Sequence, residues 1–125
     1  SIIARKNATK NEIERLHKKF LKYFKTKNIK INAIYFCPHH PKYSGSCNCR
    51  KPKIGLIKKA QNRYNIDIKN SWLVGDKTTD IKAGKKSGLK TILVKTGYGG
   101  LDKKYKVKAD YTYKNLIDAV KNINL

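Results

Sequence analysis

The feature that most constrains this chain is the segment of residues 37–51, C-P-H-H-P-K-Y-S-G-S-C-N-C-R-K. Between positions 37 and 49 it holds all three cysteines and two of the three histidines, and two cations follow. Structural Zn²⁺ sites use thiolate and imidazole ligands, usually ~4 in a tetrahedron. The pairs C-x-H and C-x-C supply such a set, and an odd cysteine count argues against a disulfide framework. We therefore expect a structural zinc loop over residues 37–49, with the ligands Cys37, His39, Cys47 and Cys49.

The choice of histidine has one alternative. His40 is next to His39 in the sequence, and adjacent residues generally cannot both reach one metal ion. The spacing of C-x-C is matched by Cys37-x-His39, which favours His39. The third histidine, His17, is far away in the chain, and we expect it to be a solvated helix residue.

Length and hydrophobic patterning indicate a folded domain. The chain has 125 residues, of which 39% are hydrophobic and arranged in periodic blocks, so residues 1–125 suit one domain with a single core. No apolar run approaches the ~18–20 residues of a membrane span, and no signal-peptide pattern opens the sequence. With its thiols assigned to a metal, the protein is expected to be cytoplasmic and to have no membrane partner.

The formal net charge of +22 raises the possibility of nucleic-acid binding. The lysines, however, are spread over almost every segment, which indicates a compositional bias and only non-specific, salt-sensitive binding. A zinc-stabilised nucleic-acid-binding module, the alternative from another functional class, would interleave aromatic residues with lysines on one exposed face. Most aromatic residues here fit core positions, so no specific nucleic-acid partner is expected.

Helical and strand patterns alternate along the chain. The sequence T-K-N-E at positions 9–12 has the form of a capping box, and apolar residues at helical spacing follow to about residue 27. A second helix is expected from Pro52 to about residue 65, and a third continues from the turn of residues 75–80 to Ser87, with Gly88 as its C-cap glycine. A final helix is expected from residue 116 onward. Short apolar runs predict strands at residues 33–36, 71–74 and 91–94, and one more at 109–112. This alternation predicts an α/β fold with a parallel sheet.

Polar clusters follow the predicted strands, and ligands of open α/β sheets bind at the carboxyl ends of strands. These clusters are the zinc loop with Arg50 and Lys51, the turn of residues 75–80, and the glycine-rich residues 96–100. Gly75 would allow a tight turn that exposes the Asp76 carboxylate. If a helix starts at once, Asp80 would face the same side, and such carboxylates suit Mg²⁺ completed by a phosphate.

Cations near these carboxylates would meet a phosphate. Lys77, Arg50 and Lys51 would bring positive charge to a phosphoryl group during its transfer. The alternative is a solvated helix start in which aspartate is favoured by the helix dipole. The arginine–lysine pair after another strand makes the functional interpretation the better one.

Four motifs together resemble a known family. They are C-P-H-H-P at 37–41, C-N-C-R-K-P at 47–52, V-G-D-K at 74–77 with Asp80, and T-G at 96–97. In this order they are similar to the zinc-containing histidinol-phosphatase and heptose-bisphosphate phosphatase branch of the haloacid dehalogenase superfamily. The resemblance covers nearly the whole chain. It implies a three-layer, Rossmann-like parallel sheet of the haloacid dehalogenase type, with a zinc-binding loop.

The resemblance also implies roles for the residues that match the motifs. The zinc ligands would be Cys37, His39, Cys47 and Cys49. The active-site residues would be Lys51 for stabilising the phosphoryl group, Arg50 for substrate recognition, Asp76 for Mg²⁺, Lys77 for a further substrate contact, and Asp80 in the outer shell of the Mg²⁺.

A weaker part of the resemblance lies at the start of the sequence. The family pattern T-N-Q-S-G-I-A-R-G is similar to what surrounds residues 1–6, so Ser1 would be the serine of a phosphate-binding turn. Ile2 and Lys6 replace glycines of that pattern.

The chain departs from the family in one respect. Family members begin with a strand ending in D-x-D-G-T, whose first aspartate attacks phosphorus and whose second is the general acid/base, whereas no D-x-D occurs in these 125 residues. We therefore expect a sequence that represents the carboxyl-terminal part of a phosphatase and lacks the nucleophile and first strands. A non-catalytic, zinc-binding remnant is a further possibility.

The resemblance implies a Mg²⁺-dependent phosphatase of sugar phosphates. The expected reaction is removal of the 7-phosphate of D-glycero-D-manno-heptose 1,7-bisphosphate through an aspartyl-phosphate in the complete enzyme, a step of the heptose biosynthesis that serves lipopolysaccharide. Histidinol phosphate is the alternative substrate. The expected partner is the phosphorylated small molecule, and the protein is expected to be a monomer.

Overall fold

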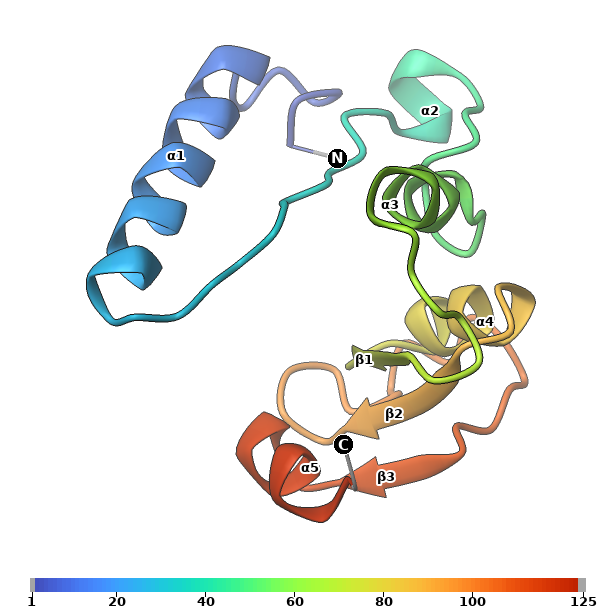
Figure 1. Cartoon of the computed structure of the whole chain (residues 1–125). Coiled ribbons are helices and arrows are strands. Elements are labelled where there is room, and N and C mark those ends of the chain that lie inside the picture. The colour runs from blue at the N-terminus through green and yellow to red at the C-terminus, as the bar shows by residue number, and fades with distance from the viewer. Residues whose placement is uncertain (1, 124–125) are drawn as a thin grey trace. The chain divides into compact units, whose positions relative to one another are not determined.

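The computed structural model describes residues 2–123, and the chain divides into two compact units. Unit 1 is Ser1–Arg50 and unit 2 is Lys51–Leu125 (Figure 1). The expectation of one domain over residues 1–125 stays a prediction. Among the described residues, no helix combines the length and apolar character needed to cross a membrane.

Unit 1 begins with the helix α1, Lys10–Thr26, which is capped as the sequence predicted. The Thr9 Oγ1 accepts a hydrogen bond from the Glu12 N–H at 3.2 Å, and the Glu12 carboxylate accepts one from the Thr9 N–H at 2.7 Å. The hydrogen bonds that the Thr9 N–H and Oγ1 donate to this carboxylate lower the pKa of Glu12. The capping box is confirmed, because two backbone N–H groups that the helix leaves unpaired are satisfied locally.

The apolar face of α1 is only partly covered. No residue of the helix is buried, and Leu16 remains 59% exposed. The rings of Phe20 and Phe24 lie 4.5 Å apart. His17 lies on α1 as expected and is half-buried, because its ring packs edge-on against Phe36 with 5.1 Å between the ring centroids.

Residues 33–36 form no strand, which corrects the prediction made from their apolar and aromatic run. The reason is that a strand exists only through hydrogen bonds to a neighbouring strand. Within residues 2–123, the sheet has three strands, and none of them pairs with this segment. A short helix that the sequence did not indicate, α2, Pro41–Ser44, follows the first cysteine–histidine pair.

Unit 2 contains a parallel sheet of β1 (Trp72–Gly75), β2 (Lys90–Val94) and β3 (Tyr111–Tyr113), in the spatial order β1-β2-β3. The strands β1 and β2 place Val74 opposite Ile92, and β2 and β3 place Val94 opposite Tyr113. Since parallel neighbours need crossover connections, helices lie between them in the sequence. The predicted parallel α/β fold is confirmed.

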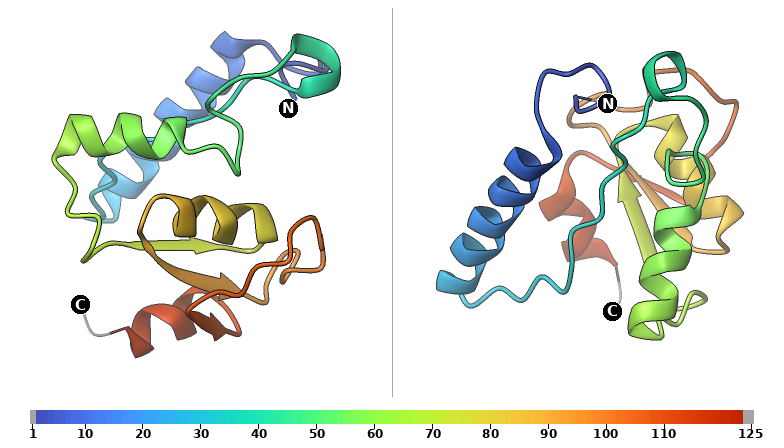
Figure 2. Two further views of the ribbon diagram at one scale, coloured as in Figure 1. Left: turned by 90° about the vertical axis from the view of Figure 1, so that its right-hand side faces the viewer. Right: turned by 90° about the horizontal axis from the view of Figure 1, so that it is seen from above.

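Helices cover both faces of this sheet (Figure 2). The helix α4, Thr78–Lys86, packs on β1 and β2, and α5, Leu116–Asn122, packs on β2 and β3 from the opposite face. Alternate residues of β2 therefore face different helices. Ile92 packs with Ala119 of α5, whereas the Thr91 methyl group lies against Gly84 of α4.

The remaining helix boundaries differ slightly from the predictions. The helix α3, Gly55–Tyr64, starts three residues after Pro52, because residues 51–53 form a turn. Gly88 follows α4 with φ +76°, as expected for a C-cap glycine.

An aspartate fixes the start of β2. The Asp110 carboxylate accepts hydrogen bonds from the N–H and Oγ1 of the fully buried Thr91 at 2.8 and 2.7 Å, and it forms an ion pair with Lys85. The ion pair with Lys85 and the hydrogen bonds from Thr91 lower the pKa of Asp110 to about 2. This network joins α4 to both β2 and the residue that precedes β3.

Candidate functional site

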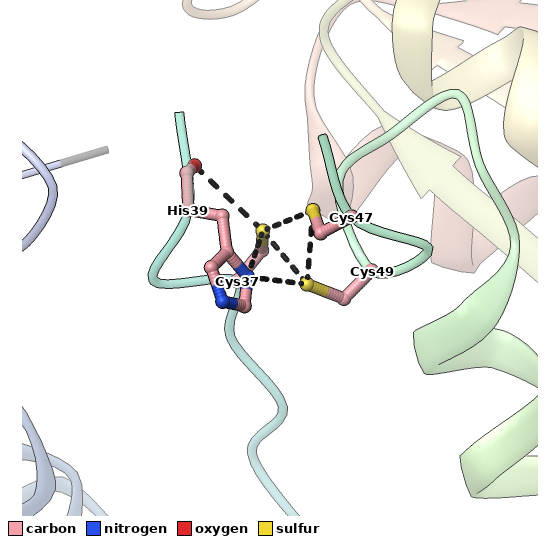
Figure 3. A group of neighbouring side chains, drawn as sticks. All are labelled: Cys37, His39, Cys47 and Cys49. Atoms are coloured by element: carbon pink, nitrogen blue, oxygen red, sulfur yellow. Dashed lines mark hydrogen bonds between the residues drawn. The ribbon is translucent and has the colours of Figure 1, made fainter. Parts of the chain in front are cut away.

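The structure brings the four predicted zinc ligands together in unit 1. The ligand atoms of Cys37, His39, Cys47 and Cys49 all lie within 4.8 Å of one another, and their side chains point toward a common centre (Figure 3). The Sγ atoms are 2.9 to 3.6 Å apart, and the His39 Nδ1 is 3.2 Å from the Cys49 Sγ. The donor set fits Zn²⁺, because three thiols and an imidazole are a standard structural site.

The ionisation of the thiols also favours a bound cation. Burial raises the pKa of Cys47, but hydrogen bonds from Cys49, Cys37 and the backbone outweigh it and lower the pKa to about 6. Burial raises the pKa of Cys49 to about 12, together with its hydrogen bonds to the other two thiols. One thiol therefore ionises readily, and its negative charge disfavours ionisation of a second thiol, because like charges this close repel each other. A divalent cation between them would relieve this repulsion.

Two neighbours of the cluster take other roles. His40 is excluded from it, because its Nδ1 accepts a hydrogen bond from the Lys42 N–H at 3.2 Å and caps α2. The Arg50 guanidinium donates to the His39 carbonyl at 3.2 Å and so supports the loop itself. Whether Arg50 also recognises a substrate stays a prediction.

In unit 2, the buried Asp80 joins two candidate residues at the carboxyl end of β1. Its Oδ1 pairs with the Lys51 ammonium, and its Oδ2 accepts a hydrogen bond from the Lys77 N–H at 3.1 Å. Asp80 is 4% exposed, whereas the Lys51 side chain is 57% exposed. The Lys51 ammonium is thus held by a buried carboxylate, while the Lys51 side chain stays accessible to solvent.

The position of Asp80 has a different cause from the one that the sequence suggested. The helix α4 begins at Thr78, so Asp76 precedes it and does not share a helical face with Asp80. Gly75 is needed for a close approach and not for a positive φ, since a Cβ there would lie 2.3 Å from the Asp80 Cβ. The missing side chain lets Asp80 turn back against the strand end.

The glycine-rich loop of residues 96–100 holds Asp76. The Tyr98 N–H donates to the Asp76 Oδ2 at 2.9 Å, and the Gly100 N–H donates to the Asp76 carbonyl at 2.8 Å. Gly97 has φ +71°, and a Cβ there would lie 2.4 Å from Asp76 Oδ2. Within residues 2–123, no hydrogen bond is donated to the Asp76 Oδ1. One carboxylate oxygen can therefore serve a hard cation, which suits Mg²⁺.

Two contributors were not singled out from the sequence. The ring of Tyr98 lies under the Lys77 ammonium, with 3.7 Å between the Nζ and the ring centroid. Asp102 caps α4 by accepting from the Thr78 N–H at 2.7 Å and from its Oγ1 at 2.9 Å. Burial raises the pKa of Asp102, but these hydrogen bonds outweigh it and lower the pKa. The glycine-rich signature pointed to the loop but carried no signal for these side-chain contacts.

Ser1, the remaining candidate for substrate binding, lies outside the described residues. The residues that the structure does gather at the end of β1 are a carboxylate with one open oxygen and two cations. Such a group can bind a divalent cation and a phosphate together, because each neutralises part of the other's charge.

Comparison with known proteins shows which family the chain resembles. The family model described as HAD-hydrolase-like matches residues 48–119. The D-glycero-alpha-D-manno-heptose-1,7-bisphosphate 7-phosphatase of Photorhabdus laumondii is 48% identical over 80 residues, which are 59% of this chain and 44% of the relative. The D-glycero-beta-D-manno-heptose-1,7-bisphosphate 7-phosphatase of Haemophilus ducreyi is 39% identical over 101 residues, which are 77% of this chain and 55% of the relative.

A solved structure is similar along nearly the whole chain. It is the D,D-heptose 1,7-bisphosphate phosphatase of B. bronchiseptica complexed with magnesium and phosphate, with a TM-score of 0.84 and 27% identity. The similarity covers 97% of this chain and 68% of that one. The chain spans about half the length of the curated relatives it matches. A family match over more than half of the chain, together with these relatives, shows that the chain belongs to the HAD-hydrolase-like family.

Proposed function

We propose that this chain forms part of a Mg²⁺-dependent phosphatase that hydrolyses the 7-phosphate of D-glycero-D-manno-heptose 1,7-bisphosphate. The observation that carries the proposal is that the Asp80 carboxylate pairs with the Lys51 ammonium and accepts a hydrogen bond from the Lys77 N–H at the end of β1. Relatives named for this reaction, and a similar structure complexed with magnesium and phosphate, support the proposal.

In this proposal each side chain has a distinct task. The open oxygen of Asp76 would hold Mg²⁺, which would supply charge neutralisation at the phosphoryl group. Lys51 would bind a phosphoryl oxygen, and the Asp80 carboxylate would keep its ammonium in place. Lys77 would contact the substrate, with Arg50 and Ser1 as further substrate-binding residues. In the complete enzyme an aspartate would attack phosphorus, and no D-x-D sequence for it occurs in these 125 residues.

The thiol–imidazole cluster would have a structural task. Zn²⁺ held by Cys37, His39, Cys47 and Cys49 would have four protein ligands and no open position for a substrate. It would hold both ends of the loop that leads into Arg50 and Lys51. That the protein is a cytoplasmic monomer without a specific nucleic-acid partner stays a prediction.

Hydrolysis by the protein expressed from its own gene tests the proposal. We expect phosphate release from the heptose bisphosphate to require added Mg²⁺ and to exceed release from histidinol phosphate. Asp76→Asn should lower kcat/KM by about two orders of magnitude or more, because a metal-binding carboxylate is lost. Asp67→Asn is the matched control, since that exposed carboxylate binds only Lys69 and Asn70.

Three results would contradict the proposal. The first is Mg²⁺-independent turnover, and the second is an Asp76→Asn variant as active as Asp67→Asn. The third is no hydrolysis of the heptose bisphosphate by a folded, zinc-loaded protein. A preference for histidinol phosphate would overturn the named substrate and leave the reaction class intact.

A further inference from the structure

Tyr98 contacts two neighbouring site residues through different parts of its structure. Its main-chain N–H donates to the Asp76 carboxylate at 2.9 Å, while its ring lies 3.7 Å from the Lys77 ammonium. The first contact does not depend on the side chain, and the second depends on it entirely. A substitution of the ring can therefore change the surroundings of Lys77 and leave the hydrogen bond to Asp76 in place.

The contact with the Tyr98 ring restrains the position of the Lys77 ammonium. Within residues 2–123, the Lys77 ammonium forms no ion pair, although its charge contributes a minor part of the lowered pKa of Asp102. An aromatic face attracts a cation through its quadrupole and leaves the net charge of the cation unchanged. A carboxylate in the same place would cancel that charge. The ammonium is thus restrained while remaining available to an anion.

The loop backbone places the ring where this contact forms. Gly97 and Gly99, on either side of Tyr98, have φ values of +71° and +54°. A Cβ on Gly99 would lie 2.9 Å from the Lys95 carbonyl oxygen. Only glycine adopts both conformations without strain, so the two glycines fix the direction in which Tyr98 leaves the chain.

We propose that Tyr98 is a positioning residue that holds the Lys77 ammonium for contact with an anionic oxygen of the phosphorylated substrate. This inference rests on the proposed function, because the anion is taken to be the phosphate monoester. Tyr98 itself would touch no reacting atom. Its hydroxyl group is not needed, since the cation is attracted to the ring face.

The geometry has a spectroscopic signature. In the full chain with isotope-labelled lysines, the ε-methylene protons of Lys77, assigned by their loss in Lys77→Met, should be shifted upfield by the ring current. Tyr98→Phe should retain this shift, and Tyr98→Leu should abolish it. Tyr105→Leu is the matched control, because Tyr105 makes the same kind of contact with Lys82 at 3.9 Å. It should abolish only the Lys82 shift.

The function of the contact is tested with inorganic phosphate in the presence of Mg²⁺. Titration should move the Lys77 resonance, and Tyr98→Leu should weaken the apparent Kd about two- to five-fold, as expected for an exposed cation–π contact. Tyr98→Phe, which keeps the ring, should bind phosphate with the wild-type Kd, and so should Tyr105→Leu.

The inference is overturned if Lys77 shows no upfield shift, if phosphate leaves its resonance unmoved, or if Tyr98→Leu binds phosphate like the wild type. Its failure is distinguishable from failure of the proposed function. A protein that shows these effects but hydrolyses no phosphate monoester refutes only the proposed function. Hydrolysis with a Tyr98→Leu variant that is unchanged in phosphate binding refutes only the role of Tyr98.

Discussion

The ion pair between Lys85 and Asp110 should make a measurable, pH-dependent contribution to the stability of unit 2. In the folded protein the pKa of Asp110 is about 2, against an ordinary value of 3.8. That difference corresponds to about 2.4 kcal/mol if it is fully expressed, and it is shared between the Lys85 ammonium and the hydrogen bonds from Thr91. The side chains of Lys85 and Asp110 are 40% and 36% exposed, so solvent screening reduces the expected contribution to about 1 kcal/mol.

The sign of the pH dependence follows from the lowered pKa. Above about pH 4 the carboxylate is ionised in both folded and unfolded states, and the stabilisation is fully present. As the pH falls from about 4 to about 2, the unfolded state takes up a proton before the folded state does. The contribution of Asp110 should therefore be lost progressively over this interval.

A double-mutant cycle isolates this contribution. The free energy of unfolding in urea is measured for the wild type, Asp110→Asn, Lys85→Met and the double variant at pH 7 and at pH 3. We expect a coupling energy of about 1 kcal/mol at pH 7 that becomes smaller at pH 3. Acid effects elsewhere, such as release of a metal from the thiols, cancel in the cycle. A coupling energy below about 0.3 kcal/mol at pH 7, or one unchanged at pH 3, would refute this reasoning.

Three further changes have expected outcomes. Gly75→Ala should lower the free energy of unfolding by about 1–3 kcal/mol, because its Cβ would lie 2.3 Å from that of Asp80; urea denaturation matching the wild type would contradict this. Cys49→Ser should abolish stoichiometric zinc in the purified protein by metal analysis, since one of four converging donors is lost; an unchanged zinc content would argue against the cluster. Thr9→Ala should cost about 1 kcal/mol by removing the hydroxyl that accepts from Glu12, and thermal unfolding at the wild-type temperature would exclude this role.

Local features of this protein were predictable from the sequence. The capping box of Thr9 and Glu12 needs only residues three apart, and it formed as predicted. The C-cap glycine at Gly88 and the parallel pairing of β1 with β2 likewise follow from short-range patterns and alternation. The strand predicted at residues 33–36 did not form, because an apolar run cannot show whether a neighbouring strand pairs with it.

The candidate site divides in the same way. The residue types and spacing of the zinc loop predicted Cys37, His39, Cys47 and Cys49 as one ligand set, and the structure brings their ligand atoms together, while zinc binding itself stays a prediction. The sequence could not indicate that Tyr98 would lie under Lys77, since the two residues are far apart in the chain. It also gave a wrong reason for the position of Asp80, which depends on the space left by Gly75.

What the sequence alone determined is the chemistry available: a thiol–imidazole set, a G-D-K turn after a strand, and an arginine–lysine pair. Only the tertiary structure decided which charges meet. Asp80 binds Lys51, Asp110 binds Lys85, and the ring of Tyr98 receives Lys77. The physical reason is that composition and spacing act over a few residues, whereas each of these contacts depends on chain crossings that bring distant segments together at one end of the sheet or the other.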